Sequence, residues 1–180
     1  MENTQSCSCL QIGKMAPDFT AEGLFGDAVK TVSLKDFKGK WLVIFFYPLD
    51  FTFVCPTEIT AFNDAYEKFQ ALNTEVLSVS VDSVYSHKAW QKDLGVMKFG
   101  MLSDITKEIS KKYGVLIEEK GIALRGAFVI DPDGIIKMSV IHDLSIGRNV
   151  DEIVRVVEAC QTGELCPMGW KHGDTTLGKA

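Results

Sequence analysis

Cys55 is the residue of this sequence whose type and setting point most directly to chemistry. It lies in the segment YPLDFTFVCPTE, residues 47–58, which follows an apolar run and precedes a predicted helix. A passage from strand to helix at the carboxyl edge of a sheet is where open α/β folds carry their sites. Because Pro56 is tolerated in the first turn of a helix, we expect Cys55 at or just inside the helix start, with the helix amides facing its sulfur.

Such a setting predicts a cysteine that reacts as a thiolate. A free cysteine, with a pKa of about 8.5, is only about 3% ionised at pH 7, but a helix N-terminus and a nearby cation lower that pKa by one to several units. We expect Thr52 to donate a hydrogen bond to the sulfur or to an oxygen brought next to it, and Pro48 to shield the pocket from water. The alternative is an unreactive cysteine packed in the core, which the polar and conformationally restricted neighbours of Cys55 disfavour.

The other cysteines have different predicted roles. The five cysteines stand at positions 7, 9, 55, 160 and 166. An odd number of cysteines, in a chain large enough to fold without disulfide bonds, indicates reduced thiols rather than a disulfide framework. Cys7 and Cys9 form a CxC pair with no nearby His or Cys to complete a zinc site, so no metal centre is expected. Cys160 completes the apolar face of a predicted helix and is interpreted as a packing residue, whereas Cys166 lies in the tail segment GELCPMGWKHG.

The pattern of apolar residues predicts an α/β scaffold around these side chains. Strands are expected at residues 41–47, 75–81, 127–130 and 135–141, the last two joined by the turn DPDG. Helices are expected at residues 56–72, 86–94, 104–113 and 149–161. Alternating strands and helices, followed by an antiparallel hairpin and a final helix, give a mixed central sheet flanked by helices. That order is similar to the thioredoxin-like architecture.

Length and composition limit the remaining possibilities. The 180 residues fit one compact domain, expected at residues 13–162 between a flexible arm, 1–12, and a tail, 163–180. The longest apolar run is far shorter than the roughly 20 residues of a membrane span, and no secretory signal is present, which predicts a cytoplasmic protein. The net charge of −5 argues against nucleic-acid and membrane partners.

The histidines do not cluster and are predicted to be surface or capping residues: His87, His142 and His172.

The segment around Cys55 resembles the active-site signature of the peroxiredoxins, which Pro48, Thr52 and Cys55 match in order. The resemblance continues along nearly the whole chain at four further places: Trp90, Arg125 in LRGAFVIDPDG, Arg148 in IGRN, and Cys166 followed by Pro167. The most similar class is that of the typical two-cysteine peroxiredoxins, which includes the peroxidase subunit of bacterial alkyl hydroperoxide reductase.

This resemblance implies a thiol peroxidase. The thiolate of Cys55 would attack the O–O bond of hydrogen peroxide or an organic hydroperoxide and become a sulfenic acid, with no metal, haem or other cofactor. Arg125 would lower the pKa of Cys55 and hold the peroxide. Thr52 would hydrogen-bond the peroxide oxygens, and Pro48 would protect the sulfur from water.

Further residues are expected to support the site. Trp90 and Arg148 belong to the segments that carry the resemblance. Glu58 is expected either to pair with Arg125 or Arg148 near the pocket or to serve only as an acidic residue in the first turn of a helix.

The resemblance also implies how the enzyme is recycled. The sulfenic acid would condense with a second thiol to form a disulfide, and Cys166 is the expected resolving cysteine. In the family such a tail cysteine comes from the partner subunit of a homodimer, and dimers assemble into a ring of five. The residues alone leave both an intersubunit and an intrasubunit bridge open. Thioredoxin or a dedicated flavoprotein reductase would reduce the disulfide.

Two other functions can share the same cysteine. One is a peroxide sensor that passes its disulfide to a regulator, and the other is a ring-shaped holdase that binds unfolded proteins. A thioredoxin-type dithiol reductase is disfavoured because Glu58, and not a second cysteine, stands three positions after Cys55.

Overall fold

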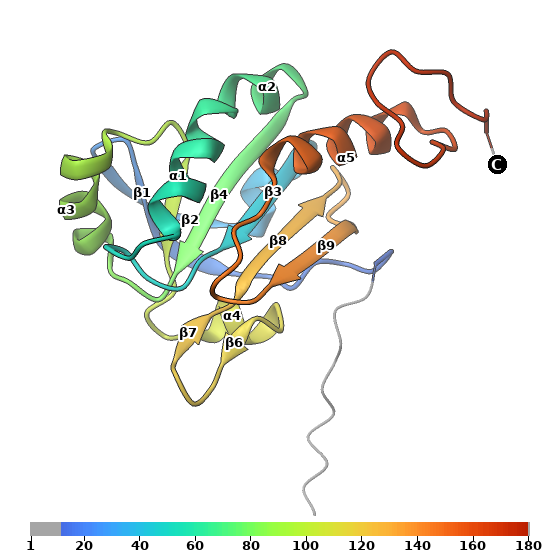
Figure 1. The fold of residues 1–180 in the computed structure, drawn as a ribbon. Helices are drawn as coiled ribbons and strands as arrows, with labels where there is room; N and C mark the ends of the chain where they lie inside the picture. The colour runs from blue at the N-terminus through green and yellow to red at the C-terminus, as the bar shows by residue number, and fades with distance from the viewer. Residues whose placement is uncertain (1–11, 180) are drawn as a thin grey trace, which may run out of the picture.

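The computed structural model describes residues 12–179 and has a mixed seven-stranded sheet at its centre (Figure 1). Its strand order is β2-β1-β5-β4-β3-β8-β9. The strands are β1 (Thr20–Phe25), β2 (Ala28–Ser33), β3 (Trp41–Phe46), β4 (Thr74–Ser80), β5 (Gly100–Ser103), β8 (Arg125–Ile130) and β9 (Ile136–His142). β3, β4 and β5 are parallel, and the other pairings are antiparallel. Two short strands, β6 (Leu116–Ile117) and β7 (Ile122–Ala123), pair separately.

Helices cover both faces of this sheet. They are the 3-10 helix η1 (Leu34–Phe37), α1 (Cys55–Asp64), α2 (Tyr66–Ala71), α3 (Val84–Leu94), α4 (Glu108–Lys112) and α5 (Val150–Thr162). In Figure 1, α1, α2 and α5 lie in front of the sheet, and they contribute to the same buried cluster. Ile109 of α4 packs into the cluster on the opposite face.

The central strand β3 is buried on both faces, which explains its continuous apolar sequence. Val43 and Phe45 face the cluster beneath α1 and α5. Leu42, Ile44 and Phe46 point to the other cluster, as the alternation of side chains along a strand requires. The prediction of a strand buried on both faces is therefore confirmed, and with it the α/β class and the mixed central sheet.

The predicted number of strands was wrong. Four strands were expected, whereas the sheet has seven because β1, β2 and β5 were missed. β2 has four exposed residues out of six and carries no apolar run, and β5 is only four residues long. The predicted hairpin is confirmed: β8 and β9 pair antiparallel around the DPDG turn.

Two predicted helices also differ from the structure. The helix expected at 56–72 is interrupted at Ala65, so that it forms α1 and α2. The helix expected at 104–113 is reduced to α4, because the side chain of Asp104 accepts hydrogen bonds from the amides of Ile109 and Ser110. Lys107, directly before α4, has a left-handed backbone with φ of 63°. Asp104 therefore caps the helix instead of belonging to it.

The tail folds back on itself after α5. The backbone of Leu165 bonds to Leu177 and to Gly178. Trp170 is buried, and its carbonyl accepts a hydrogen bond from Arg155 of α5. Cys7 and Cys9 lie outside the described residues.

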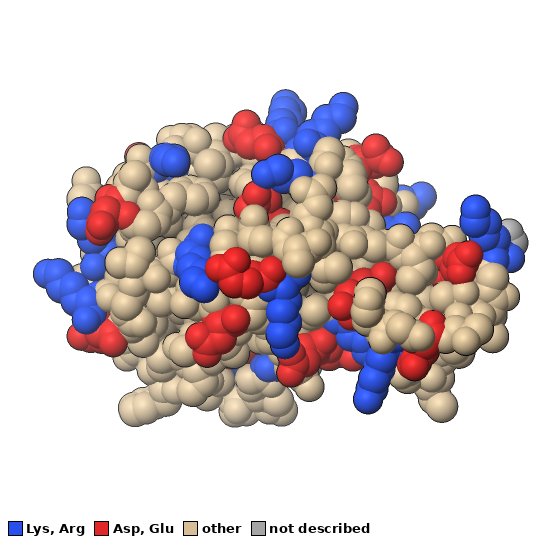
Figure 2. Space-filling view, turned by 90° about the horizontal axis from the view of Figure 1, so that it is seen from above, with Lys and Arg blue, Asp and Glu red and all other residues tan. Residues whose placement is uncertain are grey.

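The surface mixes both signs of charge. Figure 2 shows Lys and Arg interspersed with Asp and Glu on the face seen from above. Of the helices within residues 12–179, none has the length and apolar character needed to cross a bilayer.

Candidate active site

Cys55 is the first residue of α1, where the chain enters the helix from the loop after β3. Its side chain is fully buried. Pro56 occupies the second helical position, where a missing amide hydrogen leaves no intrahelical bond unmade. The carbonyl of Val54 accepts the amides of Thr57 and Glu58, which closes the first turn. The predicted position at the helix start is confirmed, and the positive end of the helix faces the cysteine.

Arg125 brings a cation to this sulfur from the first residue of β8. Its Nη1 atom lies 3.5 Å from Sγ of Cys55 and 2.6 Å from Oε2 of Glu58. Its Nε atom donates to the carbonyl of Leu144 over 2.8 Å. The side chain of Arg125 is almost fully buried, so its charge acts at short range and with little screening by solvent.

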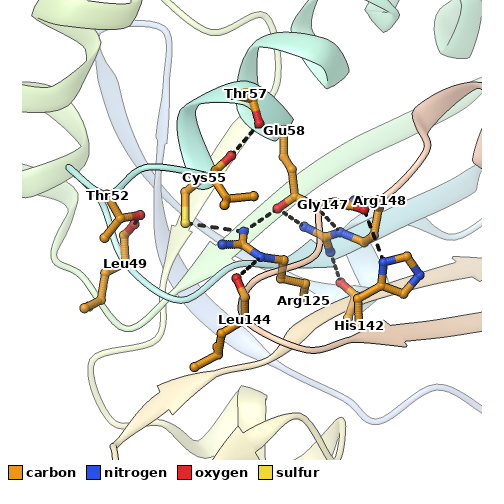
Figure 3. A network of polar contacts seen from close by, with 12 residues as sticks. Leu49, Thr52, Cys55, Thr57, Glu58, Arg125, His142, Leu144, Gly147 and Arg148 are labelled. Atoms are coloured by element: carbon orange, nitrogen blue, oxygen red, sulfur yellow. Dashed lines mark hydrogen bonds and ion pairs between the residues drawn. The ribbon is translucent and has the colours of Figure 1, made fainter.

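A second arginine clamps the same glutamate (Figure 3). Arg148 donates to Oε1 of Glu58 from its backbone amide and from Nε, each over 2.8 Å, and to Oε2 from Nη2 over 2.9 Å. Its Nη1 atom donates to the carbonyl of Gly126. The sequence predicted an ion pair of Glu58 with Arg125 or with Arg148. In the structure Glu58 pairs with both arginines.

Burial and the neighbouring arginines shift the pKa of Glu58 in opposite directions. Burial alone raises the pKa of Glu58, but the hydrogen bonds and charge of Arg148, together with the charge of Arg125, hold it below its usual value. Burial lowers the pKa of Arg148, and Glu58 opposes that shift. Two guanidinium groups and one carboxylate leave one excess positive charge beside Cys55. A thiolate at Cys55 neutralises that excess.

The other predicted residues lie around the loop before α1. Thr52 donates from Oγ1 to the carbonyl of Leu49 over 3.0 Å and not to the sulfur, so the first of its two expected acceptors is not used; a hydrogen bond to a bound oxygen stays a prediction. Pro48 is buried. Trp90 is buried and packs its ring against Phe51, with 6.0 Å between ring centroids. Trp90 thus contacts the loop.

The prediction for His87 was wrong, because this histidine is fully buried. Its Nδ1 atom lies 2.9 Å from the carboxylate of Asp50, in the loop before α1, and its Nε2 atom lies 3.2 Å from the carbonyl of Leu102. Asp50 also accepts hydrogen bonds from Tyr47 and Ser86. This buried network fixes the loop that leads to Cys55. The sequence contains no local signal for it, since His87 and Asp50 are 37 positions apart.

Cys166 lies at the opposite end of α5 from this cluster. The helix begins directly after Arg148 and Asn149 and continues for 13 residues, a length of about 20 Å at 1.5 Å per residue. Sγ of Cys166 is half-buried beside the last turn of α5, 3.5 Å from Oγ1 of Thr162. Figure 1 shows the tail at the end of α5 that points away from the start of α1.

Cys160 is less deeply packed than predicted. It is only half-buried, whereas Ile153 and Val157 on the same helix are buried. Burial raises the pKa of the Cys160 thiol, with an opposing effect of the Lys137 charge.

Comparison with known proteins gives one consistent result. Residues 12–139 match the AhpC/TSA family. The chain is 52% identical to the chloroplastic 2-Cys peroxiredoxin BAS1 of Hordeum vulgare, covering 92% of this chain and 84% of the relative. It is 50% identical to Peroxiredoxin-2 of Mus musculus, covering 93% and 89%.

Solved structures agree with this result. The reduced 2-Cys peroxiredoxin of Plasmodium vivax superimposes with a TM-score of 0.89 at 45% identity, covering 92% of this chain and 91% of that one. AhpC of Enterococcus faecalis gives a TM-score of 0.83 at 41% identity, covering 88% and 99%. These neighbours have the thioredoxin-like fold that the element order predicted. With a buried cysteine beside an arginine at the start of a helix, and with relatives of this similarity along most of its length, the chain belongs to the AhpC/TSA family of peroxiredoxins and is a thiol peroxidase.

Proposed function

We propose that Cys55 is the peroxidatic cysteine and that it reduces hydrogen peroxide and organic hydroperoxides. Its thiolate attacks one peroxide oxygen, so that an S–O bond forms as the O–O bond breaks. The electron pair leaves on the other oxygen, which takes up a proton and departs as water or an alcohol, and Cys55 becomes a sulfenic acid. The contact of 3.5 Å between Cys55 and Arg125 carries this proposal, because it brings a buried positive charge to the sulfur.

Arg125 and Thr52 are assigned to peroxide binding. Within residues 12–179, the Nη2 atom of Arg125 has no protein hydrogen-bond partner, so its N–H groups are available to a peroxide oxygen. The hydroxyl of Thr52 donates its hydrogen to the carbonyl of Leu49. The lone pairs of its oxygen remain available to accept a hydrogen bond from the peroxide. Pro48, buried within the loop after β3, excludes water from the sulfur.

Glu58, Arg148 and Trp90 are assigned supporting roles. Glu58 holds the guanidinium of Arg125 beside the sulfur, and Arg148 holds Glu58. Trp90 packs under the loop that carries Thr52. These residues act on the reaction through Arg125 and Cys55.

Cys166 is the proposed resolving cysteine, supplied by the partner subunit of a homodimer. Disulfide formation requires Cα atoms within about 7 Å, whereas α5 separates the tail of a chain from its own site by about 20 Å. β9 is an edge strand of the sheet, and an unpaired edge is suited to pairing with a second copy. The tail, 163–180, would then bring Cys166 across the interface, with residues 13–162 forming the peroxidase domain.

The proposal extends to a ring of five dimers in the cytoplasm, reduced by thioredoxin or by a flavoprotein reductase. Large exposed aromatic side chains support a further interface: Phe51 and Phe53 in the loop before α1, and Tyr85 at the start of α3. Phe53 is 96% exposed, two residues before Cys55, and apolar groups in this position favour burial by another subunit.

Turnover of single-cysteine variants tests the proposal. Cys55→Ser should lose peroxidase turnover with a dithiol reductase. Cys166→Ser should still consume one equivalent of peroxide per subunit and then stop. Cys160→Ser, in which both proposed redox cysteines remain, is the matched control and should turn over like the wild type. Multiple turnover by Cys55→Ser would refute the assignment.

A further inference from the structure

His142 lies beside the active-site cluster, but it has no role in the peroxidase reaction proposed for Cys55. It is the last residue of β9 and the register partner of Arg125, the first residue of β8. Register partners of antiparallel strands project their side chains from the same face of the sheet. The imidazole of His142 therefore lies on the face that carries Cys55 and Glu58, as Figure 3 shows.

The loop that follows His142 supplies several contacts of the site. The carbonyl of Leu144 accepts the hydrogen bond from Nε of Arg125. The amide and side chain of Arg148 hold Glu58. The positions of both guanidinium groups, those of Arg125 and Arg148, thus depend on the backbone conformation of residues 143–148.

Hydrogen bonds inside the loop add to these contacts. Within it, the carboxylate of Asp143 accepts the amide of Leu144, and the carbonyl of Asp143 accepts the amide of Ile146. The His142 ring closes the loop from the strand side, with Nδ1 lying 3.3 Å from the carbonyl of Gly147. Because a carbonyl only accepts, Nδ1 is the donor in this bond.

Gly147 connects this bond to the cluster. A Cβ atom built on Gly147 would lie 3.6 Å from Val54 and 3.8 Å from Cγ of Glu58, so the backbone at Gly147 packs against the start of α1. Its carbonyl carbon is bonded to the amide nitrogen of Arg148, which donates to Glu58 over 2.8 Å. Displacement of the Gly147 peptide therefore moves the amide that holds Glu58.

We propose that His142 is a positioning residue of the peroxidase reaction, and that it acts by fixing the Gly147–Arg148 peptide through the Nδ1 hydrogen bond. This inference rests on the role of Cys55 proposed above. Gly147 is exposed, so water can replace the imidazole at its carbonyl without leaving a buried acceptor unpaired. The hydrogen bond thus contributes to the orientation of the Glu58 and Arg125 side chains more than to the stability of the fold.

Two substitutions at this position separate hydrogen bonding from packing. Asn places an amide nitrogen close to the position of Nδ1 and retains the donor, whereas Leu fills similar space without a donor. His142→Leu should slow the single-turnover oxidation of Cys55 by hydrogen peroxide about fivefold, the value of one ordinary hydrogen bond. His142→Asn should restore most of that rate. Thr31→Leu, at an exposed position of β2 on the far edge of the sheet, is the matched control and should react like the wild type.

Melting temperatures of all variants are measured together with these rates. A wild-type rate for His142→Leu, or equal losses in the Leu and Asn variants, would overturn the inference. A rate loss in His142→Leu that matches a collapse of the melting temperature, with no rescue by Asn, would also overturn it in favour of a purely structural role. An error in the role proposed for Cys55 is detected separately. In that case Cys55→Ser would keep its peroxidase turnover, independently of the results for the His142 variants.

Discussion

Arg125 donates from Nη1 to the sulfur of Cys55 over 3.5 Å, although the two residues are 70 positions apart in the chain. The same nitrogen atom lies 2.6 Å from a carboxylate oxygen of Glu58. The guanidinium is thus held by the carboxylate on one side and faces the reactive sulfur on the other. Changes to either partner are expected to alter the reactivity of Cys55 through this one group.

Replacement of Arg125 by lysine should slow sulfenic acid formation by about a hundredfold, comparable to the loss of one donor that stabilises developing charge. Lysine retains the positive charge, but it has no planar fork to bind Glu58, the Leu144 carbonyl and the peroxide at once. Stopped-flow measurement of the first peroxide turnover gives this rate. Oxidation of Arg125→Lys at the wild-type rate would show that charge alone is sufficient.

Glu58→Gln should lower the free energy of unfolding by about 3 kcal/mol, because it leaves two buried guanidinium groups without their carboxylate. Denaturant unfolding of the reduced protein measures the change. The matched control is Glu67→Gln, whose carboxylate pairs with Lys98 at the surface and whose loss should cost less than about 1 kcal/mol. Equal effects of the two substitutions would mean that the buried cluster adds no more to stability than a surface ion pair.

The Glu58 cluster should also make the protein sensitive to acid. The pKa of Glu58 lies below its usual value in the folded protein, so ionised Glu58 contributes stability above its unfolded-state pKa, about 4.3. This contribution is lost as the pH falls through the folded-state value. The difference in unfolding free energy between wild type and Glu58→Gln should therefore be full at neutral pH and shrink below about pH 4. A difference that stays constant down to pH 3 would contradict the lowered pKa.

The position of Cys55 could be predicted because its signals are local, whereas Arg125, Arg148 and Trp90 were indicated by the family resemblance. The apolar run of β3, the Pro after Cys55 and the helix that follows place the cysteine within a dozen neighbouring residues. The partners of Glu58 could only be given as alternatives, because Arg125 and Arg148 are 67 and 90 positions away. Sequence periodicity carries no information about contacts at such separations.

The missed elements have a related physical origin. β2 lies at the edge of the sheet with most side chains exposed, so burial does not constrain its sequence to an apolar pattern. His87 reads as an ordinary polar residue of a helix, and its burial depends on Asp50 from a distant loop. Both cases depend on tertiary packing.

Oxidation should convert the protein to a covalent dimer. On a non-reducing gel after peroxide treatment, the wild type and Cys160→Ser should run as dimers, whereas Cys166→Ser should remain monomeric. The physical reason is the length of α5, which keeps Cys166 away from Cys55 of its own chain. An oxidised wild type that runs only as a monomer would favour an intrasubunit bridge.

The roles of Cys55 and Cys166 are tested together by mass spectrometric mapping of the fully reduced protein after one equivalent of hydrogen peroxide, with Cys166→Ser trapped in parallel by a sulfenic-acid reagent. The trap should label Cys55 alone in the variant, and the wild type should yield a peptide pair joined through Cys55 and Cys166. Labelling of Cys160 in place of Cys55, or a wild-type disulfide that omits Cys55, would contradict these two roles.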